Sequence, residues 1–281
     1  MEKKLITYDS GDGLSTPDVG VWAIEKYKIL YCFANILATG MKKVMNKRVY
    51  IDLFAGAGRA KIRESGQIVG TSAIIALSMK DPFDKYIFCE KDKANLMALK
   101  ERVQREFGDR EVVYLHGDSN ILVESIENEI PQTNMTLNFC FVDPFASNIE
   151  FDTIRKLGRD RKMDFLILLA IGMDLHRNKK LYSEISHDRI DKFLGDDSWR
   201  GELTDALKED NEFRRFIMRK YIDQMNKEGY LKRTLDEIMR EVRTPDNVSL
   251  YHLAFFSKHD RGYDFWKKAR KSGTNKPQLW D

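Results

Sequence analysis

The segment with the clearest chemical potential spans residues 50–59 and reads Tyr-Ile-Asp-Leu-Phe-Ala-Gly-Ala-Gly-Arg. An apolar run followed by two closely spaced glycines predicts a buried strand that ends in a tight turn. Gly56 and Gly58 would tolerate positive φ and let the backbone approach a nucleoside cofactor, while Asp52 would lie at the strand end. The same short pattern also fits an ordinary strand-to-loop turn without a ligand.

The pattern Asp-x-Phe-x-Gly-x-Gly, formed by Asp52, Phe54, Gly56 and Gly58, resembles motif I of class I S-adenosylmethionine (SAM) methyltransferases. This resemblance implies that Asp52 lies below the methionine portion of SAM. A dinucleotide is less favoured, because the Rossmann pattern G-x-G-x-x-G needs a third glycine, and Lys61 stands at that position. We therefore expect SAM as the cofactor.

Glu90 directly follows the apolar run 86–89, which predicts a second strand. A carboxylate at this position could accept hydrogen bonds from both ribose hydroxyls of a nucleoside. Alternatively, Glu90 could cap the helix that is predicted to begin near Asp92. Asp52 and Glu90 are farther apart than the usual ~20 residues, so residues 59–70 are expected to form an extra loop.

Asp118 and Ser119 follow a third predicted strand, residues 112–115. The Asp118 carboxylate could accept a hydrogen bond from the amino group of adenine, but both residue types are also common in turns and at helix N-caps. The candidate cofactor-binding residues are therefore Asp52, Phe54, Gly56, Gly58, Arg59, Glu90, Asp118 and Ser119.

Asp143, Pro144 and Phe145 follow the apolar run 137–142 and are the candidate catalytic residues. They resemble motif IV of amino-directed methyltransferases, an Asp/Asn-Pro-Pro-aromatic turn. The resemblance implies that Asp143 and a proline carbonyl accept hydrogen bonds from an exocyclic amine, while the aromatic ring stacks on a flipped base. This chain has a single proline and its aromatic residue comes one place early, so a strand-ending turn with Phe145 in the core is the alternative.

Arg177 and Asn178 follow a fifth predicted strand and are the candidate substrate-binding residues. They could contact an anionic or base-bearing substrate, or they could simply begin a surface helix. His252 and His259 match no metal-ligand spacing, so no metal site is expected.

Strand and helix predictions alternate along the chain, which indicates an α/β protein with a doubly wound sheet. Apolar runs predict strands at residues 48–54, 86–89, 112–115, 137–142 and 165–170. Helices are predicted at residues 71–80, 92–107, 121–128 and 151–158. An earlier amphipathic helix is predicted from Thr16-Pro17 to Gly40, and a turn at 244–247 is predicted to join residues 237–243 and 249–257 into a C-terminal antiparallel hairpin.

These elements suggest a division of the chain into consecutive parts around one core. The predicted parts are an N-terminal polar segment and amphipathic helix (1–47), a SAM-binding α/β core (48–177), a helical insertion (178–230), a hairpin and helix that complete the core (231–270), and a polar tail (271–281).

Composition bounds the class of protein without naming a substrate. A chain of 281 residues with 42% hydrophobic content can bury a substantial core. A net charge of +3, from 47 basic and 44 acidic residues, is too balanced to indicate nucleic-acid binding by itself. The longest apolar run, residues 165–173, is shorter than the ~20 residues of a membrane span, and no export signal is recognised. The three widely spaced cysteines are typical of reduced thiols, so a cytoplasmic location is expected.

The chain as a whole resembles the three-Cys-motif partner protein (TcmP) family, a bacterial group with a methyltransferase-like fold. The resemblance covers most of the chain and rests on Trp22, Lys26 and residues 50–59, 70–72, 141–145, 173, 177–178, 194–195, 199–200 and 251–262. It implies an association with a partner protein that carries a radical-SAM-like cysteine cluster.

The resulting expectation is a SAM-dependent methyltransferase whose acceptor is an amino group of a nucleic-acid base. Asp143 would orient or deprotonate the acceptor, and Phe145 would stack against it. Two alternatives remain open. One is a methyltransferase-fold binding subunit that acts with a three-cysteine partner, and the other is a methyltransferase on protein or small-molecule acceptors.

Overall fold

The structure, a computed structural model, describes residues 6–144, 148–169, 188–202, 210–243 and 249–272. Three of the candidate residues, Phe145, Arg177 and Asn178, lie outside these described residues.

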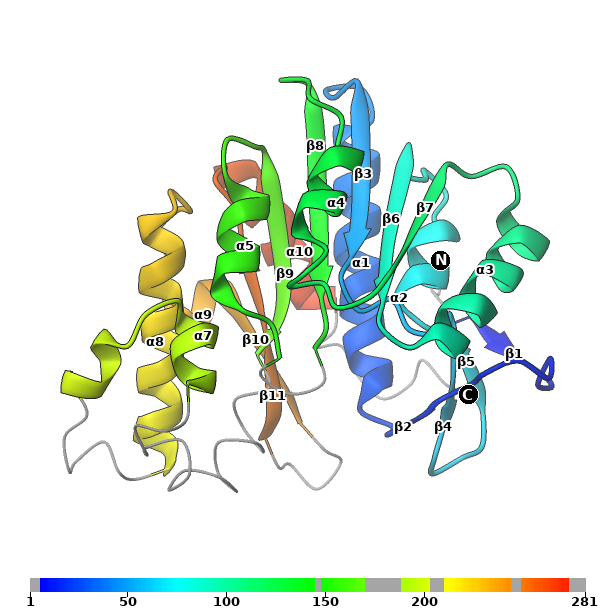
Figure 1. Ribbon diagram of the computed structural model, residues 1–281, viewed down its shortest axis with the longest axis horizontal. Helices are drawn as coiled ribbons and strands as arrows, with labels where there is room; N and C mark the ends of the chain where they lie inside the picture. Colours follow the sequence, from blue (N-terminus) through cyan, green and yellow to red (C-terminus); the bar gives the residue numbers. More distant parts are fainter. Residues whose placement is uncertain (1–5, 145–147, 170–187, 203–209, 244–248, 273–281) are drawn as a thin grey trace.

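Among the described residues, seven strands form a central sheet in the order β10-β11-β9-β8-β3-β6-β7 (Figure 1). They are β3 (Lys47–Asp52), β6 (Lys85–Glu90), β7 (Val112–His116), β8 (Thr136–Val142), β9 (Met163–Leu169), β10 (Met239–Arg243) and β11 (Ser249–Phe256). Strands β7, β6, β3, β8 and β9 run parallel to one another, whereas β11 pairs antiparallel with both β9 and β10. This arrangement confirms the predicted doubly wound sheet that ends in an antiparallel hairpin.

Helices cover both faces of the sheet. They are α1 (Ala23–Met41), α2 (Ser72–Leu77), α3 (Lys93–Phe107), α4 (Val123–Glu129), α5 (Phe151–Gly158), α7 (Arg189–Leu194), α8 (Asp210–Lys227), α9 (Leu235–Ile238) and α10 (Asp260–Ser272), with a 3-10 helix at Ser198–Glu202. In Figure 1, α4 and α5 lie in front of the sheet, and α1 and α10 lie behind it in contact with each other. Helix α7 contacts both α5 and α8, so the described part of the predicted helical insertion extends the front layer.

The sequence explains where these elements form. Strands β8 and β9 are buried along their whole length, as expected for central strands covered on both faces. The Asp92 side chain accepts a hydrogen bond from the Asn95 N–H at 2.8 Å and caps α3. Gly195 ends α7 with φ of +81°, which a glycine adopts without strain.

The predicted extra loop at residues 59–70 is instead a hairpin. Strands β4 (Arg59–Ile62) and β5 (Ile68–Gly70) pair antiparallel, and the short strands β1 (Thr7–Tyr8) and β2 (Asp18–Val19) flank them in a second sheet of order β1-β5-β4-β2. The spacing between Asp52 and Glu90 could not reveal this sheet, because its outer strands come from the N-terminal segment.

Two predicted boundaries are wrong, each for its own reason. The first helix begins at Ala23 and not at Thr16-Pro17, because residues 18–19 pair with β4 and the Pro17 carbonyl accepts a hydrogen bond from the Lys61 N–H at 3.0 Å. The strand predicted from Glu237 begins at Met239, since a capping box between Thr234 and Glu237 first forms helix α9.

No helix in the described part of the chain is long and apolar enough to cross a membrane.

Candidate functional site

The carboxyl ends of four neighbouring parallel strands bring the predicted polar residues to one edge of the sheet. Asp52 pairs in register with Phe88 of β6 on one side and with Phe141 of β8 on the other. Glu90 and Asp143 each lie two residues beyond these partners, so they flank the end of β3. Open α/β sheets bind their ligands at this edge.

The turn after β3 contains two glycines with different surroundings. Gly56 has φ of +63°, and a Cβ atom added there would meet nothing within 4 Å. Gly58 has φ of +81°, and a Cβ there would lie 2.9 Å from Leu99 and 3.2 Å from Ile74. Gly58 is therefore required by the packing of α2 and α3 on the turn, whereas Gly56 leaves the open side of the turn free for a ligand.

Glu90 holds this turn in place. Its Oε2 accepts a hydrogen bond from the Gly56 N–H at 2.8 Å, and its Oε1 accepts one from the Asp92 N–H at 2.7 Å. The N-cap of α3 is Asp92, so the capping role that was the alternative for Glu90 belongs mainly to Asp92. Glu90 thus lies directly beside the open side of the glycine turn, and its contact with a ribose stays a prediction.

Asp52 is fully buried at the start of the turn and has no cationic partner among the described residues. Its Oδ1 accepts a hydrogen bond from the Phe54 N–H at 3.2 Å, and the Tyr50 hydroxyl lies 3.4 Å from its Oδ2. Burial raises the pKa of Asp52 to about 7, although hydrogen bonds from Ser72 and Phe54 lower it. A cationic ligand bound at this site would therefore stabilise the ionised form of the Asp52 carboxyl.

Asp118 and Ser119 lie beyond the end of β7. The pKa of Asp118 is raised by burial, but the Lys91 ammonium at 3.0 Å and the Asn120 N–H outweigh this and lower it overall. The buried Ser119 hydroxyl donates a hydrogen bond to the Leu53 carbonyl at 2.5 Å. Ser119 therefore supports the backbone of the turn after β3, while Asp118 is half-buried on the rim of the same edge.

Arg59 points toward the N-terminal segment. Its guanidinium pairs with Asp12 at 3.2 Å and with Glu106 at 2.6 Å, and it lies over the Tyr8 ring. These contacts give Arg59 a structural role in attaching the N-terminal segment. They do not support its predicted contact with a cofactor.

A second, fully buried arginine joins the same network. Arg102 of α3 forms an ion pair with Asp12 at 2.7 Å and donates a hydrogen bond to the Ala57 carbonyl at 2.6 Å. It also donates to the Ser15 carbonyl and to the Thr16 hydroxyl. Arg102 thereby connects the N-terminal segment to the glycine turn.

Asp143 forms an ion pair with Lys26 of helix α1, with 2.5 Å between Lys26 Nζ and Asp143 Oδ2. The two side chains are only 12% and 16% exposed. Burial lowers the pKa of Lys26, but the Asp143 carboxylate outweighs this and raises the pKa above its ordinary value. Tyr27 and Tyr251 also raise the pKa of Lys26, and the Lys26 ammonium lies over the Tyr27 ring. Pro144 follows as a buried residue.

Lys26 and Arg102 have no predicted role in the site, although each carries a signal in the sequence. Lys26 is three residues after Ala23 and four before Leu30, both buried residues of α1, so a lysine occupies the apolar stripe of this helix. Arg102 likewise falls next to Val103 and three residues after Leu99 on the buried face of α3. A basic side chain at a core position predicts a buried acidic partner.

The described residues contain no group of three or more His, Cys, Asp or Glu side chains that could hold a metal ion. The polar groups that do converge are suited to SAM in their chemistry. The open side of Gly56 leaves room for the cofactor, Asp52 would interact favourably with its positive charge, and Glu90 could accept hydrogen bonds from its ribose.

Comparison with known proteins gave matches to solved structures only. A scan of protein-family models and a search of curated proteins each found no match. A Legionella pneumophila protein matches with a TM-score of 0.50 at 9% identity, over 88% of this chain and 91% of that chain.

Two further structures, each with a bound nucleoside ligand, also match with lower TM-scores. M. jannaschii TYW2, in complex with AdoMet, has a TM-score of 0.40 at 11% identity and covers 80% of this chain and 77% of its own. The O-methyltransferase from Bacillus cereus, in complex with SAH, has a TM-score of 0.44 at 12% identity and covers 81% of this chain and 80% of its own. At these identities, the comparisons concern the fold alone. The strand order and directions described above are those of the class I methyltransferase sheet.

Proposed function

We propose that this protein is a SAM-dependent methyltransferase that binds SAM at the carboxyl edge of β3 and β6. The observation that carries the proposal is the convergence of three features at this edge: an open glycine turn, the buried carboxyl of Asp52, which has no cationic partner in the described part of the chain, and the carboxylate of Glu90. The structures of TYW2 and the Bacillus cereus enzyme, which contain AdoMet and SAH, agree with this choice of cofactor.

The residues of this chain would act mainly by positioning. SAM supplies an activated methyl group on a good leaving group, so the protein has to align the acceptor and exclude water. Asp52 and Glu90 would hold the cofactor from two sides of the turn. Asp143, at the end of β8, would face the acceptor and accept a hydrogen bond from it.

Lys26 refines the role of Asp143. Lys26 Nζ lies 2.5 Å from Asp143 Oδ2, so this ion pair fixes the carboxylate in one orientation and commits one of its two oxygens to the lysine. The Lys26–Asp143 pair is therefore better suited to orient an acceptor through hydrogen bonds than to remove its proton. An amine is such an acceptor, because it needs an oriented lone pair and can lose its proton after the methyl group is transferred. The ion pair thus supports an amino group as the acceptor, and the acceptor that we propose is the amino group of a nucleic-acid base.

The decisive experiment measures cofactor binding first and methyl transfer second. Calorimetric titration of the purified protein with SAM and with S-adenosylhomocysteine should show one saturable site. In a thermal-shift assay, SAM should raise the melting temperature more than NAD does, because a ligand stabilises the folded protein in proportion to how tightly it binds. Transfer from methyl-labelled SAM to nucleic acid, protein and metabolite fractions would then identify the acceptor class. The absence of binding to both SAM and S-adenosylhomocysteine would refute the proposal.

A second candidate function is a binding subunit of methyltransferase fold. The Lys26–Asp143 ion pair favours it, because it satisfies the one candidate catalytic carboxylate without any acceptor. The resemblance to the TcmP family would give this subunit a three-cysteine, radical-SAM-like partner in the cytoplasm. Co-purification of such a partner, together with SAM binding but no methyl transfer to any fraction, would support this second function.

A further inference from the structure

A cavity of about 490 Å³ lies at the opposite edge of the sheet from the candidate SAM site. Its lining includes the first residues of β8 and β9, whereas the SAM site follows the last residues of neighbouring strands. The end of α1 and the start of α10 complete the lining. A cavity of this size is within the range of small-molecule sites.

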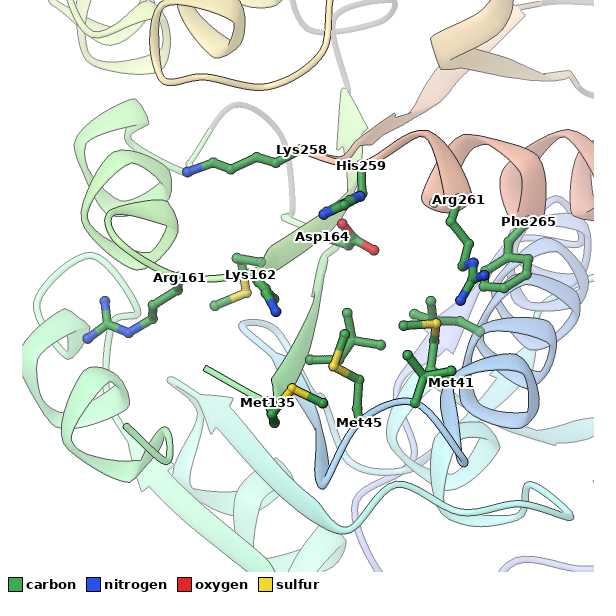
Figure 2. Close-up of a pocket in the computed structure, with 15 residues that line it drawn as sticks. Met41, Met45, Met135, Arg161, Lys162, Asp164, Lys258, His259, Arg261 and Phe265 are labelled. Carbon is green, nitrogen blue, oxygen red and sulfur yellow. The ribbon is translucent and has the colours of Figure 1, made fainter. Parts of the chain in front are cut away.

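One side of this cavity is formed by methionines. Figure 2 shows Met41, Met45 and Met135 along the wall that faces Asp164, with Phe265 beside Met41. Methionine side chains are flexible and polarizable, and their sulfur atoms make favourable contacts with aromatic rings. This wall therefore suits a flat, aromatic ligand.

Asp164 supplies an acceptor on the opposite wall. It is only 8% exposed, and Figure 2 shows its carboxylate directed into the cavity. Among the described residues it has no ion-pair partner, and its hydrogen bond comes from the Ser257 hydroxyl. That hydroxyl has a single hydrogen, which it also donates to the His259 carbonyl, with 3.1 Å between the two oxygens. A carboxylate has two acceptor oxygens, so Asp164 keeps capacity to accept hydrogen bonds from a ligand. Burial raises the pKa of Asp164 to about 7.

The outer part of the cavity is basic. The side chains of Lys162, His259 and Arg261 project around it in Figure 2. Within the described parts of the chain, Arg261 has no acidic partner, and Lys162 donates its hydrogen bond to the Asn134 carbonyl at 2.7 Å and not to an acid. A ligand whose outer end is anionic would be favoured here.

We propose that this cavity binds a guanine nucleotide, independently of the SAM site. The N1–H and N2–H donors of guanine would satisfy the Asp164 carboxylate, the flat base would contact the methionines, and the phosphate would lie near Arg261 and His259. Adenine has one donor, its N6 amino group, next to the N1 acceptor. The N1 lone pair would repel a carboxylate, so adenine would bind Asp164 poorly. A fatty acid would match the apolar wall and the basic rim but would leave Asp164 without a donor.

The proposal is tested with GMP and AMP as probes, by calorimetry on the full chain. GMP should bind at one site, and AMP should bind roughly tenfold or more weakly, a ratio expected for a lost pair of base contacts. The same titration in saturating S-adenosylhomocysteine should give the same GMP affinity. Competition between the two ligands would instead place GMP in the SAM site and overturn the proposal.

Two variants separate recognition of the base from recognition of the phosphate. Asp164→Asn should remove the preference for GMP over AMP, and Arg261→Gln, at an exposed position, should weaken both nucleotides by a similar factor. Thermal melts of both variants would establish that they are folded. Three results would refute the proposal: no GMP binding by the wild-type protein, equal affinity for GMP and AMP, or a preference for GMP that persists in folded Asp164→Asn. Tighter binding of laurate than of GMP would also refute it.

Discussion

The Asp52→Asn substitution should make the protein more stable and less able to bind SAM, because Asp52 is a buried carboxyl without a counter-charge in the described part of the chain. Burial raises the pKa of Asp52 from 3.8 to about 7. At about 1.4 kcal/mol for each pKa unit, this difference corresponds to about 4 kcal/mol. The free energy of unfolding is lower by this amount when Asp52 is charged in the folded protein than when it is protonated.

The sign of the pH dependence follows from the two pKa values. The folded state retains the proton up to about pH 7, whereas the unfolded chain releases it near its ordinary pKa of 3.8. The free energy of unfolding should therefore fall as the pH rises from about 4 to about 7 and level off above that range. An amide at this position has no proton to lose, so the stability gain of Asp52→Asn should appear at pH 8 and vanish near pH 4.

A matched control is available at the other edge of the sheet. Asp164 is also buried, and burial raises its pKa to about 7 as well. Asp164→Asn should therefore show a similar gain in stability at pH 8, but it should leave SAM affinity unchanged. Asp52→Asn should weaken SAM binding by roughly tenfold or more, since a charged partner for the cationic ligand is lost.

The measurements are urea unfolding at pH 4, 5, 6, 7 and 8 for the three proteins, and calorimetric SAM titrations at pH 6 and 8. Wild-type affinity should be higher at pH 8, where Asp52 is charged before SAM binds. If wild type and Asp52→Asn show the same pH dependence of the unfolding free energy, the reasoning about burial is wrong. If both Asn variants retain full SAM affinity, Asp52 is not part of the cofactor site.

Three further predictions concern neighbouring residues. Glu90→Gln should weaken SAM binding by roughly tenfold, as measured by calorimetry, because the charge-assisted ribose contact is lost; unchanged affinity would contradict the ribose assignment. Gly58→Ala should lower the free energy of unfolding by about 1–3 kcal/mol, because of backbone strain and overpacking. Gly56→Ala should lower it by only about 1 kcal/mol and should mainly weaken SAM binding. Equal destabilisation by the two variants in urea unfolding would contradict the packing difference between the two glycines. Lys26→Gln leaves the Asp143 carboxylate without its partner, so it should lower the stability; measured per folded molecule, it should reduce methyl transfer by on the order of a hundredfold while SAM affinity stays within about twofold. Full activity would show that Asp143 acts without Lys26.

The sequence was sufficient to predict most of the sheet. Buried parallel strands are continuous apolar runs, and each of the five predicted ones matches a strand to within a few residues. The helix at Phe151–Gly158 has the predicted limits, because its strongly amphipathic pattern begins and ends clearly. These signals are local, so they can be read without knowledge of the tertiary structure.

The second sheet could not be predicted, since it depends on contacts between distant segments. Strands β1 and β2 have two residues each and no periodicity of their own. They exist because β4 and β5 offer free edges and because Asp12 connects Arg59 to Arg102. The same long-range ion pairs hold Arg59, which the sequence predicts as a cofactor contact. Its position after the glycine turn is visible in the sequence, but its acidic partners Asp12 and Glu106 are distant in the chain on either side.

The site itself was predictable in part, and the unpredicted part changes its chemistry. The strand-end residues Asp52, Glu90 and Asp143 were all placed at one edge by the rule for parallel strands. Lys26 reaches Asp143 from a helix 117 residues earlier in the chain, and it converts a lone carboxylate into a buried ion pair. Removing one member of such a pair leaves an uncompensated charge, so Asp143→Ala alone would mix a loss of orientation with a loss of stability. The double variant Lys26→Gln with Asp143→Asn removes both charges while keeping both volumes. If Asp143 matters through chemistry, the double variant should fold and bind SAM yet transfer no methyl group.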